Sequence, residues 1–196
     1  MISKTRSTAW REIKIIGAAL GAGLLFALAV AGYSHAYAHH VQRDIADHVI
    51  RFHVRANSDR AEDQALKEAV RAGVLAAFEP ALNTDRGLEA TRRTLEGELG
   101  EMARYAADIV QAAGFDYAVS ADISRLFFPT QFYGSLSFPP GEYEAVQIII
   151  GEGAGSNWWC LMFPPLCYVD MTATESGRDQ LQNTVSEEGF MLLTHQ

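Results

Sequence analysis

The two cysteines of the chain, Cys160 and Cys167, lie in the segment NWWCLMFPPLCYVD, which also holds two of the three tryptophans. A cysteine thiolate can act as a catalytic nucleophile, but only with a histidine and an orienting group beside it in space. Two cysteines can also form a disulfide, or remain reduced as small apolar core residues. The segment therefore allows a thiol active site, a disulfide loop or a pair of buried thiols.

A disulfide places a strict geometric condition on this segment. An extended chain would hold the Cα atoms of Cys160 and Cys167 about 23 Å apart, whereas a disulfide requires roughly 4.4–6.8 Å. The chain must therefore reverse between them, and Phe163, Pro164 and Pro165 can form that reversal. We predict a Cys160–Cys167 disulfide, with reduced cysteines and a thiol active site as the alternatives.

Metal and cofactor chemistry has little support in the sequence. No histidine has the spacing expected of a zinc site, so we predict no metal and no cofactor. Asp59, Glu62 and Asp63 follow Asn57 and Ser58 where a helix begins, and helix capping explains these carboxylates better than calcium binding does. The histidines are His35, His39, His40, His48, His53 and His195.

The glycine-rich segment Gly151 to Gly155, GEGAG, resembles a phosphate-binding loop only superficially. Phosphate loops lead from a strand into a helix N-terminus, whereas this segment leads into a predicted strand at Trp158 and Trp159. Glycine also supplies the left-handed backbone conformations of tight turns. We therefore predict a hairpin turn here, and no small-molecule substrate.

The first 38 residues form a targeting segment. A basic leader precedes the uncharged run Ile15 to Tyr33, and the next charge is at Arg43. The run is close to the roughly 20 residues that span a bilayer, so its length does not separate a cleaved signal peptide from a retained anchor. Cleavage would fall near Ala36-Tyr37-Ala38. Both alternatives predict that the residues after 38 are exported.

The remainder of the chain is acidic. The total net charge is −8, and the first 38 residues contribute +3 through four basic residues and one acidic residue, which leaves −11. This charge disfavours nucleic-acid binding, because phosphate contacts require clustered lysine and arginine. The length suits one globular exported domain, residues 39–171, followed by a polar and partly disordered tail, residues 172–196.

Hydrophobic periodicity predicts the elements that position these residues. Apolar and polar residues alternate over positions 50–55, which indicates a half-buried strand with Arg51, His53 and Arg55 on its exposed face. Apolar residues four positions apart then predict a helix that Pro80 ends. A second helix begins at Asn83 or Thr84 and stops at Gly114.

Three more strands are predicted over residues 115–123, 143–150 and 158–163, the last two forming a hairpin. Residues 126–138 fit either an irregular strand or a loop that closes over the sheet. The order is strand-helix-helix-strand-strand-strand. We therefore predict an α+β, two-layer sandwich in which a helical hairpin packs on one face of a mostly antiparallel four-stranded sheet.

Two tryptophans in one strand suggest a binding surface. Adjacent strand residues face opposite sides, so at least one of Trp158 and Trp159 points away from the helices. We hypothesise that an aromatic anchor with a polar rim binds a partner, with core filling as the alternative role of both tryptophans. The candidate partner-binding residues are Trp158, Trp159, Phe163, Pro164, Pro165, Arg51, His53 and Arg55.

Several ordered motifs resemble the stage II sporulation protein R family. They are IRFHVRANSD, DQALK, FPTQFYG, PPGEYEAVQIIIGEG and NWWCLMFPPLCYVD, and together they cover nearly all of residues 49–170. Gln131 stands where the family usually has lysine, and Pro140 where it usually has alanine. The glutamine removes a charge that would be available to a partner.

This resemblance implies a signalling protein that is made in the forespore and exported to the space between the forespore and mother-cell membranes. It implies that the partner is a membrane-embedded aspartic protease of the mother cell. Once activated, that protease processes the precursor of the sporulation sigma factor E. The resemblance also implies that the chain itself is not an enzyme. An envelope thiol enzyme and a membrane-anchored scaffold module are the alternatives.

Overall fold

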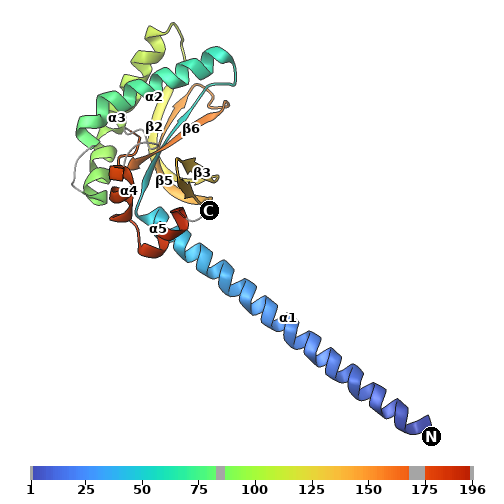
Figure 1. Cartoon of the computed structure of the whole chain (residues 1–196). Coiled ribbons are helices and arrows are strands. Elements are labelled where there is room, and N and C mark those ends of the chain that lie inside the picture. The colour runs from blue at the N-terminus through green and yellow to red at the C-terminus, as the bar shows by residue number, and fades with distance from the viewer. Residues whose placement is uncertain (1, 83–86, 168–174, 195–196) are drawn as a thin grey trace. The chain divides into compact units, whose positions relative to one another are not determined.

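Figure 1 shows a computed structural model of the chain. The structure describes residues 2–82, 87–167 and 175–194. The chain divides into two compact units, Met1–Val41 and Gln42–Gln196. The strands and the main hydrophobic core of the described residues all belong to the second unit.

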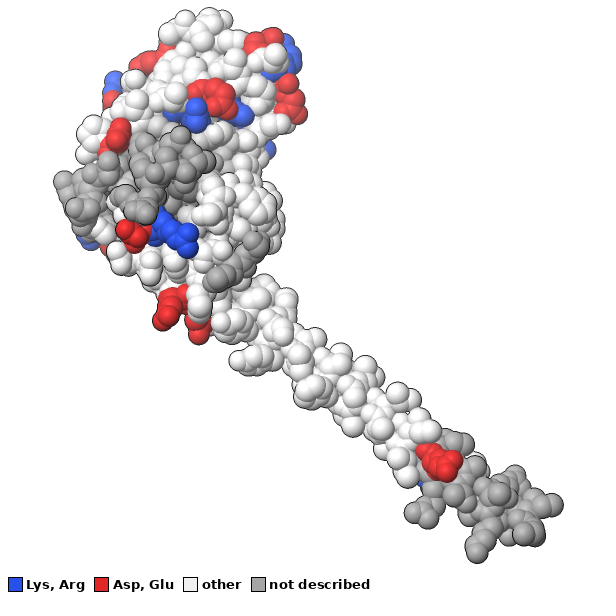
Figure 2. Space-filling view, viewed as in Figure 1, with Lys and Arg blue, Asp and Glu red and all other residues white. Residues whose placement is uncertain are grey.

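Helix α1, Ile2–Asp47, carries the predicted targeting segment. Its portion Lys14–Asp47 is long and apolar enough to cross a membrane. Large apolar side chains such as Leu25 and Phe26 are exposed on it, no charged residue lies between Lys14 and Arg43 in the sequence, and Figure 2 shows the visible face of the middle of the helix without charge. The helix is thus compatible with a signal sequence or a membrane anchor. Cleavage near Ala38 stays a prediction.

The central sheet has four strands in the order β2-β5-β1-β6. They are β1 Ile50–Arg55, β2 Val119–Phe128, β5 Gly141–Ile150 and β6 Asn157–Phe163. β6 pairs antiparallel with β1, and β2 pairs antiparallel with β5, but β1 and β5 are parallel. The sheet is therefore mixed, and the mostly antiparallel prediction is wrong for its central pair. Parallel pairing is possible there because the long helical connection returns the chain to the starting edge.

The connection from β5 to β6 is not the predicted hairpin, because β1 lies between these strands. The connection crosses the end of β1, where the Ala154 N–H donates to the Asn57 carbonyl at 3.1 Å and the Gly155 N–H donates to the Ala56 carbonyl at 3.0 Å. A Cβ atom at Gly155 would lie 2.3 Å from the Ser58 carbonyl oxygen. Glycine is required for this close approach at position 155, whereas Gly151 and Gly153, each with a φ of 58°, have the predicted left-handed backbone conformation.

Two helices, α2 Ala61–Leu82 and α3 Leu88–Ala112, pack together on one side of the sheet, which we call the helix face (Figure 1). The predicted helical hairpin on one face is confirmed. The core here consists of apolar side chains from both layers, among them Phe52, Val54, Val146 and Ile148 of the sheet and Leu66, Val70, Val74, Leu95 and Met102 of the helices.

The ends of these helices differ in part from the prediction. α2 contains Pro80 and continues to Leu82, so the proline does not end the helix. Proline removes one helical N–H and clashes with the preceding turn, which is tolerated when so little helix follows. α3 stops before Gly114, whose φ of 85° is the left-handed conformation expected after a helix. The predicted start at Asn83 or Thr84 lies outside the described residues.

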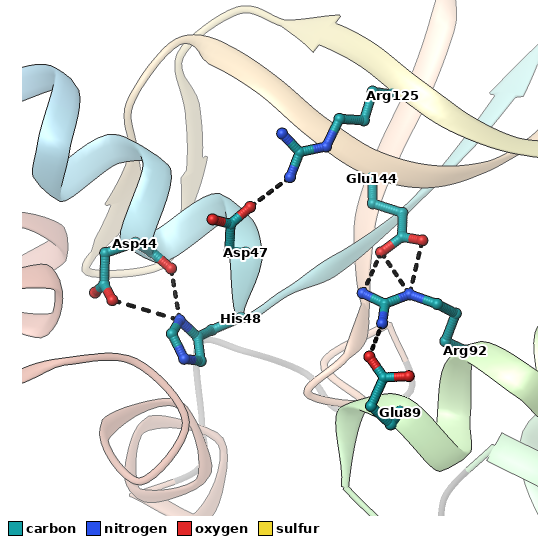
Figure 3. A network of polar contacts seen from close by, with 7 residues as sticks. All are labelled: Asp44, Asp47, His48, Glu89, Arg92, Arg125 and Glu144. Carbon is teal, nitrogen blue, oxygen red and sulfur yellow. Dashed lines mark hydrogen bonds and ion pairs between the residues drawn. The ribbon is translucent and has the colours of Figure 1, made fainter.

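Ion pairs fasten the helices to the sheet (Figure 3). Arg92 of α3 forms a bidentate contact with Glu144 of β5, with its Nε 2.9 Å and its Nη2 2.7 Å from the two carboxylate oxygens. Glu144 and Glu89 together raise the pKa of the Arg92 guanidinium. Arg125 of β2 pairs with Asp47 at the end of α1. This end of α1 is therefore part of the second unit.

A cluster of polar side chains lies between the end of β1 and the first turn of α2. The Asp63 carboxylate is buried and accepts hydrogen bonds from the Ser58 hydroxyl at 2.5 Å, the Asn57 amide at 3.0 Å and the Tyr117 hydroxyl at 3.1 Å. These bonds lower its pKa to about 2. Asp63 lies in the first turn of α2, where the helix dipole favours a carboxylate, but it accepts these bonds from side chains and not from the helix backbone, so they do not amount to the predicted capping.

The opposite side of the sheet, which we call the aromatic face, carries Arg51, His53 and Trp159. A separate two-stranded hairpin, β3 Gln131–Tyr133 and β4 Leu136–Phe138, covers part of it. Tyr133 and Phe138 of this hairpin lie within 6 Å of the Arg51 guanidinium. The segment left undecided by the sequence is thus a hairpin over the sheet, and the domain is more than a two-layer sandwich.

The C-terminal region contains two short helices, α4 Glu175–Gln182 and α5 Glu187–Thr194, and α5 packs against β4. Most of the described part of the predicted polar tail is therefore helical. Leu181, Val185 and Leu193 bury their side chains, so few but well-spaced apolar residues are enough to hold the two helices.

Candidate partner-binding site

Trp158 and Trp159 lie on opposite faces of the sheet. The Trp158 ring packs near Phe52 on the helix face, and the Arg71 guanidinium lies 4.6 Å from its centroid. Trp159 lies on the aromatic face and stacks on His53, with a centroid distance of 4.1 Å and an interplanar angle of 19°. Trp159 is therefore the tryptophan that points away from the helices.

Trp159 is the accessible part of a compact aromatic cluster. Phe128, which is buried, contacts its ring edge-on at a centroid distance of 4.5 Å and lies 5.9 Å from Tyr143. Trp159 itself is only half-buried. Contacts on two sides fix the orientation of its ring, so a partner would meet a preorganised aromatic surface.

His53 lies beneath this tryptophan and is buried, so its predicted exposure is wrong. Its Nδ1 lies 3.3 Å from the side-chain amide of Gln147. Burial lowers the pKa of the imidazole to about 4, and its Nε2 has no hydrogen-bond partner among the described residues. The ring is therefore neutral near pH 7. Alternation identified the face of the strand but could not show that this face is covered.

Arg51 is also fully buried, which again corrects the prediction of an exposed side chain. Its Nη2 donates to the Tyr133 hydroxyl at 2.9 Å, and its Cζ lies 4.0 Å from the Phe128 centroid and 4.8 Å from that of Tyr143. Burial lowers the pKa of this guanidinium. Nε and Nη1 have no hydrogen-bond acceptor among the described residues. The Arg51 guanidinium is thus surrounded by aromatic rings, where a buried arginine more often has a carboxylate partner.

Arg55 is the most accessible of the three predicted polar residues of β1. It is half-buried, pairs in register with Asn157 of β6 and lies beside Gly153 of the crossover. On the aromatic face of β1 and β6, Arg55, Asn157 and Trp159 are all half-buried, so a partner could reach them. The structure brings Arg51, His53, Arg55 and Trp159 to one face and leaves Trp158 on the other.

The turn after β6 is closed by a disulfide between Cys160 and Cys167, with their Cα atoms 5.4 Å apart. The Cys167 N–H donates to the Leu161 carbonyl at 2.9 Å, so the chain reverses as the distance argument required. Pro164 is buried, whereas Phe163 and Pro165 are half-buried. The turn supports the end of β6 and presents little free aromatic surface.

The arrangement leaves no free thiol among the described residues of the site. Both sulfur atoms are committed to the disulfide, so neither is available as a thiolate nucleophile. Among the residues that the structure describes, no group of three or more His, Cys, Asp or Glu side chains is placed to hold a metal ion. The groups that this face presents are the indole ring of Trp159, the guanidinium of Arg55 and the side-chain amide of Asn157. Groups of these kinds are common in protein interfaces.

Sequence reasoning missed the aromatic residues that cover this face. Phe128, Tyr133, Phe138 and Tyr143 come from four different strands and meet around Arg51. Their only signal in the sequence was the density of aromatic residues between positions 127 and 143. That density did not reveal which strand they would cover.

Comparison with known proteins gives one family match and one similar protein. The sequence model of the family described as Stage II sporulation protein R matches residues 46–173. The chain is 35% identical over 144 residues to Stage II sporulation protein R of Bacillus subtilis (strain 168). That alignment covers 74% of this chain and 64% of the relative, so the chain spans a little under two thirds of the relative's length.

No solved structure shows a significant match to this chain. The family match extends over the whole central sheet, helices α2 and α3 and the disulfide turn, which are the elements that build the site. On this evidence the chain belongs to the stage II sporulation protein R family.

Proposed function

We propose that the chain is an exported signalling protein that activates a membrane-embedded aspartic protease of the mother cell. The activated protease then processes the precursor of the sporulation sigma factor E. Family membership carries this proposal. The apolar helix α1 supports export, and the proposed location is the space between the forespore and mother-cell membranes, with the domain either released or anchored.

The proposed contact surface is the accessible part of the aromatic face. Trp159 provides an anchor that His53 and Phe128 hold in place, and Arg55 with Asn157 provides a polar rim. Arg51 and the turn Phe163-Pro164-Pro165 support this surface from within. Trp158 remains a proposed contact only at its exposed edge, since its ring packs beside Phe52 and Arg71.

Activation requires discrimination between two states of the protease. An activator shifts the equilibrium only by the difference between its affinities for the active and inactive arrangements, and about 1.4 kcal/mol of difference gives a tenfold shift. A rigid anchor suits this task, because little binding free energy is then spent on ordering the activator.

The alternative of an envelope thiol enzyme requires a free thiolate, and the disulfide argues against it. A membrane-anchored scaffold would act without changing precursor processing. Loss of such a scaffold would disturb the envelope while sigma factor maturation continued.

The deciding experiment is co-expression of the full chain with the protease and the sigma factor precursor in a host that lacks all three. We expect precursor cleavage on an immunoblot only when the chain is present. A protease without its catalytic aspartate is the control, and it should give no product. Equal cleavage with and without the chain would contradict the signalling function.

A further inference from the structure

The β3–β4 hairpin presents an uncharged outer surface with one prominent ring. Phe132 in the middle of β3 is 70% exposed, the highest exposure among the large apolar side chains that the structure describes in the second unit. No charged residue occurs between Arg125 and Glu142 in the sequence, and Figure 2 shows an uncharged surface over β3. In a domain of strongly acidic composition, such a surface is a candidate contact.

The two strands of the hairpin pair only with each other and form a separate sheet, so no strand pairing joins the hairpin to the main sheet. Side chains attach it instead. Arg51 donates to the Tyr133 hydroxyl at 2.9 Å, and the Tyr143 hydroxyl donates to the Pro139 carbonyl at 2.7 Å. A hairpin this short is only marginally stable alone, so these contacts set its position.

Arg51 shows that this position is maintained at an energetic cost. Its guanidinium is fully buried, and two of its nitrogens have no acceptor among the described residues. An apolar side chain of similar size would fill the same space without burying an unpaired charge. Stability alone therefore does not explain the arginine, whereas precise placement of Tyr133 and its neighbour Phe132 does.

We propose that the β3–β4 hairpin is a docking element and that Phe132 inserts its ring into an apolar recess on a partner protein. The proposal rests on the proposed function and identifies that partner as the activated protease. Arg51 acts as a positioning residue that fixes the base of the hairpin. Exposed aromatic side chains on a rigid base are typical anchors of protein interfaces.

Charge favours a protein over a lipid surface as the partner. Glu142 borders the hairpin and is exposed, and the hairpin itself supplies no lysine or arginine to attract anionic lipid headgroups. A single phenyl ring also buries too little apolar area to hold a domain on a bilayer. A basic rim around an apolar recess would complement this surface.

The test is the cleavage assay with the full chain carrying Phe132→Ser, compared with Phe127→Ser as the matched control. Phe127 is 67% exposed but belongs to β2 of the main sheet. We expect Phe132→Ser to raise the amount of chain needed for half-maximal cleavage at least tenfold, Phe132→Tyr to restore it, and Phe127→Ser to leave it within threefold. Thermal unfolding of each variant should match that of the wild type.

Each other outcome is decisive. Normal stimulation by Phe132→Ser, or equal loss in both serine variants, would overturn the assignment of the hairpin while leaving the proposed function intact. Absence of stimulation by the wild type would remove the function and this partner together. Residues 39–196 retain the whole core and can be mixed with phosphatidylglycerol vesicles. Co-sedimentation that depends on Phe132 would replace the protein partner with a lipid surface.

Discussion

The two faces of the central sheet are both covered, but they are filled by different kinds of side chain. On the helix face, Phe52 and Val54 meet a regular stripe of apolar residues from α2 and α3. On the aromatic face, Arg51 and His53 from the same strand are buried among aromatic rings. One strand therefore supplies both an ordinary core and a polar, aromatic one.

The difference distinguishes residues that stabilise the fold from residues that we assign to the proposed partner-binding surface. Apolar packing on the helix face stabilises the domain in the usual way, because it removes apolar area from water. Burying Arg51 and His53 opposes folding unless their polar groups find partners. Such residues are best explained by the surface that they support, namely Trp159 and the β3–β4 hairpin.

The largest expected effect contrasts two neighbouring residues of β1. Phe52→Ala on the helix face should lower the free energy of unfolding by about 3–5 kcal/mol, because it leaves a cavity in a packed core. Arg51→Met on the aromatic face should lower it by no more than ~1.5 kcal/mol, since the lost ring contacts are offset by removal of a buried charge. Urea unfolding followed by circular dichroism measures both.

The comparison would fail if the arginine variant lost as much stability as the alanine variant. The aromatic face would then be as important to folding as the helix face. Phe52→Leu is the control for the helix face, because it keeps most of the apolar volume and should cost clearly less than alanine.

The second prediction uses pH to address the aromatic face alone. The pKa of His53 is about 4 in the folded protein and 6.5 in an ordinary environment, so the unfolded chain binds the proton more readily. Stability is thus fully present above pH 6.5 and is lost as the pH falls toward 4, by up to ~3 kcal/mol for this group. Urea unfolding at pH 7 and pH 4.5 measures the loss.

His53→Phe keeps a ring against Trp159 and removes the titrating group, so most of that loss should disappear in the variant. Asp63, which lies on the helix side of the sheet, contributes to the pH dependence of stability over a lower pH range. Its pKa of about 2 means that its contribution is present above pH 3.8 and declines only as the pH falls toward 2. An unchanged pH dependence in the His53 variant would show that the imidazole is not buried as described.

The third prediction concerns the disulfide at the end of β6, the strand whose residues reach both faces. Replacing Cys160 and Cys167 together by serine should lower the free energy of unfolding by about 2.5 kcal/mol, the chain-entropy value for an eight-residue loop. Urea unfolding without reductant measures the change. Reductant should destabilise the wild type by a similar amount and leave the double variant unaffected. Equal stability in the absence of reductant would mean that the bridge does not form in solution.

The helix face was predictable from the sequence and the aromatic face was not. Four-residue spacing from Leu66 to Phe78 identifies a buried helical stripe directly, because a helix repeats every 3.6 residues. Alternation over Ile50 to Arg55 likewise separated the two sets of β1 side chains. It could not show that the polar set is covered, since the cover comes from a hairpin some eighty residues later in the chain.

The order in which the strands pair was the other feature that the sequence could not predict. The glycines of Gly151 to Gly155 fit both a hairpin and a crossover, and the choice depends on whether β1 lies between β5 and β6. No local pattern contains that information, because the contact that decides it joins this segment to Asn57. The disulfide was predictable, because the N-terminal apolar segment indicates export, where disulfides form, and Phe163-Pro164-Pro165 allows the chain reversal that a bridge requires.

The smallest expected effect compares an accessible arginine–aromatic contact with the buried one. Arg71 lies 4.6 Å from the Trp158 centroid on the helix side and is also paired with Glu68, with its side chain about one third exposed. Water already solvates this guanidinium, so Arg71→Met should lower the free energy of unfolding by only about 0.5–1 kcal/mol. Arg71→Lys, which keeps the charge, should lose less.

Salt distinguishes the two arginines in the same unfolding measurement. Raising the salt concentration screens the exposed Arg71 pair and should shrink the difference between wild type and Arg71→Met. The effect of Arg51→Met should be insensitive to salt, because no solvent ion reaches a fully buried guanidinium. If both variants responded equally to salt, Arg51 would be solvated, and the hairpin would not be held over it as the structure shows.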